Sequence, residues 1–208
     1  LVFFSRTTGD VVSVKSTTSR SGASSPRPAT GEPREVRAFA PASLSNLGTG
    51  FDILGLAVEG MGDEVVARLV PGSGVRVARI TGDGGRLPLD PKKNTAAIAA
   101  TSTLHKAGVD VGVELVIHKG MPLGSGLGSS AASAVAAAFA VNGLIGKPLR
   151  RVDLVDACLD AEEAVSGRHA DNVAPSLLGG LVLVRSIAPI DLVRLPVPDG
   201  LHVALVTP

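Results

Sequence analysis

The segment from residue 122 to residue 132, PLGSGLGSSAA, constrains the fold of this chain more than any other part of the sequence. Glycines at positions 124, 126 and 128 permit positive φ angles and a close backbone approach to a ligand. The Ala-rich run that follows predicts a helix over residues 129–145, whose first free N–H groups would attract an anion. The segment therefore predicts a phosphate-binding loop, and Lys119 just upstream adds positive charge.

Spacing excludes three better-known glycine motifs at this place. A Walker A loop requires a lysine directly after its last glycine, and none follows these glycines. Counting from Gly124, Ser129 stands where a dinucleotide-binding G-x-G-x-x-G needs its last glycine. Ser125 has Leu123 two places before it, so the G-x-S-x-G turn of many hydrolases is absent. A flexible turn capped by serine is the alternative interpretation.

Composition excludes several classes of partner. Lys and Arg number 20 against 19 Asp and Glu, so the chain has no general basic field for nucleic acid. It has no Trp, no Tyr and five Phe, which leaves few aromatic surfaces for stacking bases. The single cysteine excludes an intramolecular disulfide, and no apolar run is long enough to predict a membrane span. We expect a globular domain that handles a small molecule.

Residues 1–34 differ in composition from the rest of the chain. They hold 12 Ser or Thr and five Lys or Arg, but the only acids are Asp10 and Glu32. This composition is typical of an organelle transit peptide, so we expect the plastid stroma as the location, with the cytoplasm otherwise. A disordered extension is the alternative. The chain begins with Leu1 and ends at Pro208 directly after a predicted strand, so we expect the natural protein to continue at both ends.

From residue 35 onward the pattern alternates between strands and helices. Val-rich segments of alternating polarity predict strands over residues 35–40, 63–70, 75–80, 111–118, 180–185, 190–195 and 201–206. Helices are predicted over residues 95–107, 129–145 and 153–165. We expect an α+β fold over residues 35–208.

Three segments carry a resemblance to a known family. Residues 122–132 match, position for position, the ATP loop P-x-x-x-G-L-G-S-S-A-A of the GHMP kinases, which include galactokinase, homoserine kinase and mevalonate kinase. Residues 41–55 (PASLSNLGTGFDILG) and 169–180 (HADNVAPSLLGG) resemble the substrate motifs of the homoserine kinase branch. The resemblance covers about residues 35–208. It implies the N-terminal GHMP domain, ribosomal-protein-S5-domain-2-like with a left-handed βαβ crossover, without the C-terminal GHMP domain.

The resemblance also implies roles for individual residues. For Mg²⁺ it implies Ser130 and Glu162, with Glu163 as the alternative carboxylate. For L-homoserine it implies Asn46, Asp52, Asp171 and Asn172, and Asp52 is the catalytic residue that accepts a hydrogen bond from the substrate hydroxyl. The residues expected to bind ATP are Asn94, Lys119, Pro122, Leu123, Gly124, Ser125, Gly126, Leu127, Gly128, Ser129, Ser130, Ala131 and Ala132. Capping of the helix from residue 95 would by itself explain Asn94. For Asn46 and Asp52, hydrogen bonding within the turn is the alternative to substrate binding.

The function implied by this resemblance is ATP-dependent phosphorylation of L-homoserine to O-phospho-L-homoserine, in threonine biosynthesis. Three alternatives stay open: a GHMP kinase for another alcohol such as mevalonate, a non-catalytic nucleotide-binding fragment, and a hydrolase using Ser125, His169 and Asp171. We further expect that the 208-residue chain alone is not a competent kinase, because the second domain of the family closes the cleft. The oligomeric state stays open, a homodimer included.

Overall fold

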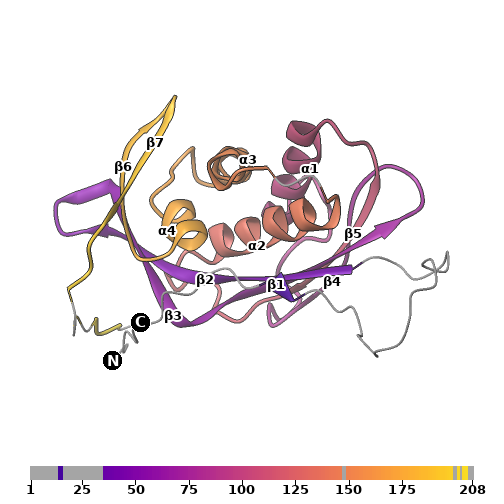
Figure 1. The fold of residues 1–208 in the computed structure, drawn as a ribbon. Helices are drawn as coiled ribbons and strands as arrows, with labels where there is room; N and C mark the ends of the chain where they lie inside the picture. The colour runs from indigo at the N-terminus through magenta and orange to yellow at the C-terminus, as the bar shows by residue number, and fades with distance from the viewer. Residues whose placement is uncertain (1–13, 16–34, 147–148, 199–200, 202, 206–208) are drawn as a thin grey trace, which may run out of the picture.

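The computed structural model describes residues 14–15, 35–146, 149–198, 201 and 203–205. Within these residues, seven strands form one sheet, of which β1 to β5 lie beneath four helices while β6 and β7 stand at one side (Figure 1). The strands are β1 (Val14–Lys15), β2 (Glu35–Leu47), β3 (Gly50–Val70), β4 (Gly74–Thr81), β5 (Gly112–His118), β6 (Leu181–Ile187) and β7 (Ile190–Leu195). The helices are α1 (Thr95–Ala107), α2 (Ser129–Leu144), α3 (Arg151–Glu163) and α4 (Val173–Leu178). The expected α+β class is confirmed.

The long strand β3 organises the sheet. The strand order is β1-β2-β3-β5-β4, and the first half of β3 also pairs with β6, which pairs with β7. Only β4 and β5 are parallel among the described pairs, and α1 connects them. The β4–α1–β5 unit is thus the crossover that the resemblance implies, and its left hand stays a prediction.

Helix α2 lies in the middle of the domain. It packs on β2 and β3 on one side and on α1 and α3 on the other (Figure 1). Twelve of its 16 residues are buried, and most of these are alanines. Small side chains permit this position because they let a helix approach its neighbours closely on every side.

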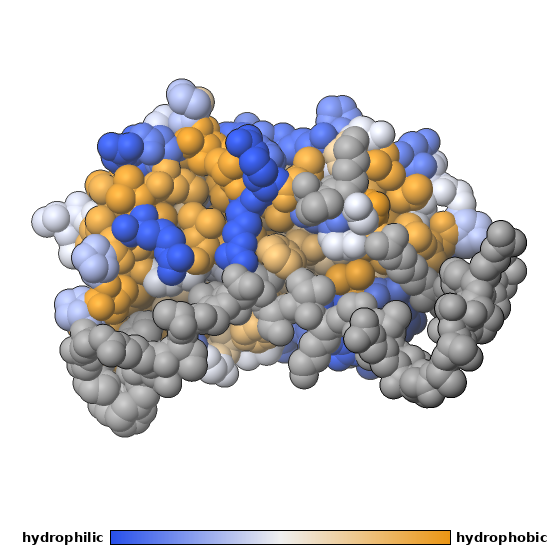
Figure 2. All heavy atoms as spheres, in the orientation of Figure 1, coloured by the Kyte–Doolittle hydropathy of each residue, from blue (hydrophilic) through white to orange (hydrophobic). Residues whose placement is uncertain are grey.

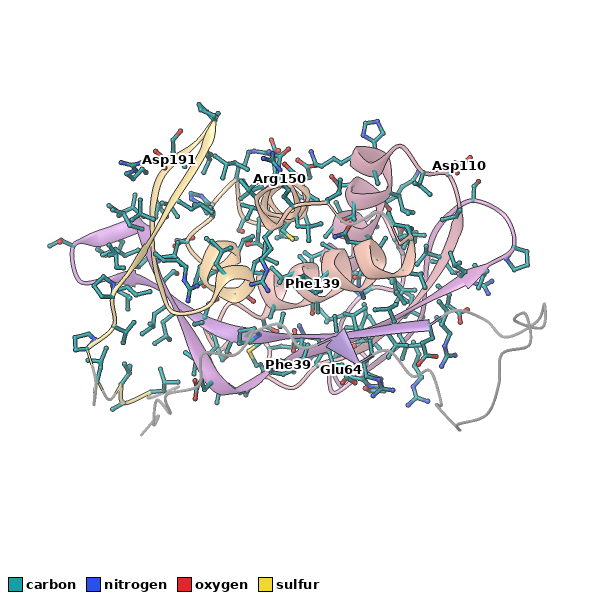
Figure 3. The ribbon with its side chains drawn as sticks, viewed as in Figure 1. Phe39, Glu64, Asp110, Phe139, Arg150 and Asp191 are labelled. Carbon is teal, nitrogen blue, oxygen red and sulfur yellow. The ribbon has the colours of Figure 1, made fainter. Side chains whose placement is uncertain are left out.

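The other face of the sheet carries polar residues. Phe39 and Glu64 lie on the face away from the helices (Figure 3). Arg37 Nη1 donates to Glu64 Oε1 at 2.8 Å across β2 and β3, in a half-exposed ion pair. At one end of the sheet, the β6–β7 hairpin stands up beside the helices, and apolar residues gather over it (Figure 2).

Strands β2 and β3 form a much longer hairpin than the sequence predicts. Residues 35–40 and 63–70 are strands as expected, but both strands continue to a two-residue turn at Gly48 and Thr49, where Leu47 pairs with Gly50. A register shift follows Pro41, which cannot donate to the ladder. The sequence did not predict the part of the hairpin between Pro41 and Gly62, because proline and glycine are both rare in strands.

Other boundaries differ by a few residues. Helix α1 has the predicted bounds, with Asn94 as N-cap and Gly108 in the left-handed conformation at its end. Helix α3 spans Arg151–Glu163 rather than 153–165, because the Glu162 carbonyl accepts hydrogen bonds from three successive N–H groups and closes the helix. Helix α4 was not predicted, since six residues with an internal proline show no helical period.

Two expected segments are described only in part. Of the strand predicted over residues 201–206, residues 201 and 203–205 are described and hold an isolated bridge at Val203. The transit-peptide-like segment 1–34 lies outside the described residues except for β1. None of the described helices combines the length and apolar character needed to cross a bilayer.

Gly55 in β3 tests how the hairpin docks on α4. A Cβ at this position would lie 1.7 Å from the Asp171 carbonyl oxygen and 2.8 Å from Pro175 Cγ. We therefore expect Gly55→Ala to lower the free energy of unfolding by about 1–3 kcal/mol, measured by denaturant titration. Gly143→Ala is the control, because its nearest neighbour is the end of the Val36 side chain at 3.3 Å. Equal stability of the two variants would show that the close backbone contact is absent.

Candidate functional site

A cleft of about 570 Å³ opens between the glycine loop, the segment before α1 and the end of α3. Its walls combine apolar residues with the backbone of the loop. The lining residues are Leu87, Pro88, Lys93, Asn94, Thr95, Ile117, Lys119, Leu123, Gly124, Ser125, Gly126, Leu127, Gly128, Ser129, Ser130, Ser133, Val165 and Ser166. The loop predicted to bind phosphates therefore faces a cleft, and Pro122, Ala131 and Ala132 lie outside its lining.

The three glycines of the loop all adopt positive φ angles. The angles are 76° at Gly124, 73° at Gly126 and 64° at Gly128. A Cβ at Gly124 or Gly126 would meet no atom within 4 Å, whereas one at Gly128 would lie 2.2 Å from Ser43 Oγ. Two glycines thus leave space beside the backbone, and the third permits contact with β2.

Helix α2 begins at this loop without a side-chain cap. Gly128 is the N-cap residue, so no side chain there accepts a hydrogen bond from the first turn. The first N–H groups of an uncapped helix carry a partial positive charge and favour an anion. The loop shape is held by two hydrogen bonds, from Ser43 N–H to the Leu127 carbonyl at 3.1 Å and from Ser125 Oγ to the Pro122 carbonyl at 2.8 Å.

Glu162, at the end of α3, presents a buried carboxylate next to the start of α2. The residue is 5% exposed, and burial raises the pKa of its carboxyl, while hydrogen bonds with Ser130 and Ser166 act in the opposite direction. Among the described residues, Glu162 Oε1 and Ser129 Oγ are the two buried side-chain polar atoms without a hydrogen-bond partner. A buried carboxylate oxygen beside a hydroxyl suits a hard cation such as Mg²⁺.

Glu163, the alternative carboxylate, forms an ion pair instead of facing the start of α2. Glu163 has a 64% exposed side chain and forms an ion pair with Arg168 at 3.2 Å, so the geometry favours Glu162 for a cation. No cluster of three or more His, Cys, Asp or Glu suited to a metal occurs in the described part of the chain. A site completed by ligand oxygens and water, as Mg²⁺ often prefers, needs no such cluster.

Lys119 and Asn94 both line the cleft, but their polar atoms are engaged within the protein. Lys119 Nζ donates to Asp63, to the Ser129 carbonyl and to Ser133, and burial lowers the pKa of the ammonium although Asp63 opposes this. Asn94 Oδ1 accepts from Ala97 N–H at 3.3 Å, which confirms the predicted helix cap. Its Nδ2 donates to the Pro88 carbonyl at 3.0 Å. The expected nucleotide contacts of both residues stay predictions.

Asn46, Asp52 and His169 gather at the exposed tip of the β2–β3 hairpin. Asn46 and Asp52 adopt positive φ angles of 56° and 60°, which are uncommon for residues other than glycine. Asp52 N–H donates to Asn46 Oδ1 at 3.0 Å, so the expected turn hydrogen bond is confirmed. The Asp52 carboxylate, 64% exposed, lies 3.4 Å from His169 Nδ1. The tip therefore holds one carboxylate that is free to accept from a ligand as well.

Asp171 and Asn172 join the hairpin to the glycine loop. Asp171 is 2% exposed, and its charge contributes to the raised pKa of Glu162. The Asn172 amide accepts from Ser43 Oγ at 2.9 Å and donates to Ser45 Oγ at 3.1 Å. The oxygen and the nitrogen of this amide are therefore both bonded to β2, and Ser43 also lies beside Gly128.

None of the four residues expected to bind the substrate lines the cleft. Asn46 and Asp52 lie at the hairpin tip, whereas Asn172 lies beside Gly128 at the end of the loop. Sequence reasoning missed Ser43, Ser45, Asp63 and Ser133. The motif at residues 41–55 pointed to the region of the first two, but a lone acid in a strand and a serine in a helix gave no signal. The hydrolase alternative finds no support, because Ser125 bonds within its own turn and His169 lies beside Asp52.

Comparison with known proteins finds one family model that matches part of this chain. Residues 94–180 match the model for the GHMP kinases N terminal domain. The matched residues run from the N-cap of α1 through α4 and include the glycine loop.

Several proteins named homoserine kinase are similar to this chain. The protein named homoserine kinase in Arabidopsis thaliana is 50% identical over 179 residues, which are 83% of this chain and 48% of that protein. The homoserine kinase of Chlorobium phaeovibrioides is 44% identical over 186 residues, 84% of this chain and 58% of that one. The crystal structure of homoserine kinase from Cytophaga hutchinsonii matches with a TM-score of 0.76 and 47% identity over 84% of this chain and 55% of that chain.

The chain spans about half the length of these relatives. A mevalonate kinase from Methanococcus jannaschii shares the fold, with a TM-score of 0.60 at 14% identity over 81% of this chain and 57% of that one. At that identity the similarity concerns the fold alone.

The burial of Glu162 predicts a cost to stability at neutral pH. A carboxyl whose pKa is raised by folding destabilises the folded state above that pKa, and the cost disappears as the pH falls toward the ordinary value of 4.5. We expect Glu162→Gln to raise the Tm at pH 7.5 and to change it little near pH 4.5. Thermal unfolding across this pH range measures the effect. The matched control is Glu163→Gln, which should leave the Tm unchanged at both pH values, and a Glu162→Gln protein less stable at pH 7.5 would contradict the assignment.

Proposed function

We propose that this chain forms the ATP- and substrate-binding half of a homoserine kinase, which transfers the γ-phosphoryl group of ATP to the hydroxyl of L-homoserine. The observation that supports this best is the convergence of two features at one cleft, the open glycine backbone and the uncapped start of α2. The unpartnered oxygen of Glu162 is buried beside this cleft, on the carboxylate that Ser130 contacts. The names of relatives with 44–50% identity agree with it.

The phosphates of ATP would lie along residues 124–130. The N–H groups of the loop and of the first turn of α2 supply the donors, and the missing side chains at Gly124 and Gly126 leave the space. Leu87, Pro88 and Val165 form an apolar wall of the same cleft, which suits the adenine ring. The exposed side chain of Lys93 at this cleft adds positive charge.

Ser130 and Glu162 would hold Mg²⁺. The fit rests on the buried, unpartnered Oε1 of Glu162 and on the hydrogen bond that brings Ser130 to the same carboxylate. When bound, Mg²⁺ neutralises charge on the transferred phosphoryl group. The role of the two residues is to place the phosphates beside the hairpin tip.

L-homoserine would bind between the hairpin and α4. Its ammonium needs acceptors, for which the family resemblance supports Asp171 and Asn46, and its hydroxyl needs a partner, for which it supports Asp52. In the reaction the hydroxyl oxygen forms a bond to the γ-phosphorus, the bond between that phosphorus and the β,γ-bridging oxygen breaks to release ADP, and the hydroxyl proton passes to solvent water. Asp52 orients the hydroxyl by accepting a hydrogen bond from it. Asn172 keeps β2 in place for this contact.

A substrate panel tests the proposal against a kinase for another alcohol. Because the chain spans about half the length of its relatives, two forms are compared: the 208-residue chain, and a fusion with the second half of the Arabidopsis relative after residue 208. ADP release is measured with L-homoserine, mevalonate and galactose. We expect the fusion to prefer L-homoserine at least tenfold and the chain alone to be at least tenfold slower. A fusion that binds ATP but releases ADP with none of the three would favour the non-catalytic alternative.

We also propose that residues 1–34 direct the protein to plastids. Their hydroxyl-rich, acid-poor composition and the plant relative support this. A fluorescent protein fused after residue 34 should accumulate in plastids, and retention in the cytoplasm would contradict the proposal.

Gly126→Val tests the phosphate loop. Valine cannot adopt the φ angle of 73° without strain, and its side chain would occupy the space assigned to the phosphates. We expect ATP to bind at least tenfold more weakly, measured by calorimetry on the 208-residue chain. Gly72→Val is the control, because Gly72 has a φ of 95°, meets no atom within 4 Å and lies outside the cleft. Equal loss in both variants would assign the effect to strain alone.

Asp52→Asn tests the hairpin tip in the fusion protein. The amide keeps the shape and one acceptor oxygen but loses the charge that polarises the hydroxyl. We expect kcat to fall at least tenfold, about 1.4 kcal/mol in the barrier, with a smaller rise in KM for homoserine. Asp110→Asn, in the exposed loop before β5 (Figure 3), is the control and should change neither constant. A change confined to KM would limit Asp52 to binding.

A further inference from the structure

Three polar side chains are buried together beneath the glycine loop, and we name them the Lys119 cluster: Asp63, Lys119 and Ser133. Asp63 lies in β3 and Ser133 in α2, whereas Lys119 directly follows β5. Asp63 is fully buried, Ser133 is 4% exposed, and the Lys119 side chain is 2% exposed. Burial of a charged pair is costly unless its hydrogen bonds are satisfied, so the contacts of this cluster need an explanation.

The ammonium group of Lys119 has three N–H donors, and three protein atoms accept from it. These are Asp63 Oδ2, the Ser129 carbonyl at 2.8 Å and Ser133 Oγ at 2.7 Å. A phosphate could contact the ammonium only by displacing one of them. The group is therefore committed to the protein on the buried side of the loop.

Asp63 is equally engaged. Its Oδ2 also accepts from Ser133 Oγ at 2.7 Å, and its Oδ1 accepts from Gly120 N–H at 3.0 Å. The carboxylate thus holds the backbone where the loop segment begins, at Gly120, and through Lys119 it holds the carbonyl of Ser129, where α2 begins. Both ends of the glycine loop are attached to β3 by one buried carboxylate.

We infer that Asp63 and Lys119 are positioning residues for the phosphate loop, which fix its two ends to β3, and that Lys119 is not itself a phosphate ligand. The inference rests on the proposed binding of ATP phosphates to this loop. The ion pair has no net charge, so attraction of the phosphates comes from the N–H groups of the loop and from the exposed Lys93. The loop is then held ready for ATP before ATP binds, which lowers the ordering cost of binding.

The sign of one mutational effect separates this role from direct contact. If Lys119 were a phosphate ligand restrained by Asp63, the change Asp63→Asn would free its charge for the phosphates and tighten ATP binding. If the pair positions the loop, the same change detaches both loop ends and weakens ATP binding. Adenosine has no phosphates and would bind only where the adenine of ATP binds. Its affinity should therefore stay the same when the phosphate loop is displaced.

The test measures Kd values for ATP with Mg²⁺ and for adenosine on the 208-residue chain, together with the Tm. We expect Asp63→Asn to weaken ATP about tenfold and Ser133→Ala about threefold, with adenosine unchanged within twofold. A purely structural role would lower the Tm and leave both Kd values unchanged. Asp156→Asn, which breaks the half-buried ion pair with Lys106 outside the cleft, is the matched control and should leave both Kd values unchanged.

Ser133→Ala covers the case in which Asp63→Asn does not fold, because it removes one acceptor of Lys119 and one donor to Asp63 and leaves both charges in place. If Lys119 were a phosphate ligand, the lost acceptor would free one N–H donor for the phosphates and tighten ATP binding. Unchanged or tighter ATP binding in Ser133→Ala, or in a folded Asp63→Asn, would overturn the inference. Failure of the unmodified chain to prefer ATP over adenosine would instead contradict the proposed function.

Discussion

The burial of α2 between the sheet and the other helices is the constraint on which the rest of the structure depends. The alanines of α2 permit this burial, because a helix of larger residues could not lie so close to β2, β3, α1 and α3 at once. The packing of α2 fixes the position of its N-terminus relative to the sheet (Figure 1). The glycine loop that leads into it, the carboxylate of Glu162 and the end of β5 are then fixed around that place.

The charges of the site follow from this packing. The glycine loop lines the cleft, whereas the buried ammonium of Lys119 is neutralised by Asp63. Glu162 keeps one oxygen without a protein partner, at a cost that burial imposes and that a bound cation would relieve. The hairpin tip is different, since Asp52 is largely exposed and retains room for a ligand. Buried groups thus surround the loop proposed to bind the nucleotide, and an exposed group lies at the end proposed for the acceptor.

Two glycines join segments that are far apart in the chain. Gly128 lets the loop meet Ser43 in β2, and Gly55 lets β3 meet the backbone of Asp171. The Asn172 amide bonds both Ser43 and Ser45 on the same strand. The loop, the hairpin and the start of α4 are thus joined by direct contacts. This coupling gives a physical reason for three motifs to occur in one domain.

The sequence by itself determined the features that depend on neighbouring residues. The positive φ angles of the loop glycines, the extent of α1 from its Asn94 cap to Gly108, and the Ala-rich α2 all follow from local conformational preferences. Only the tertiary structure decided the long β2–β3 hairpin and the short α4, because proline and glycine conceal both and packing stabilises them. It also decided the partner of Lys119, since Asp63 lies 56 residues away. The local sequence shows that a lysine lies next to the glycine loop, but the folded sheet determines which carboxylate forms an ion pair with it.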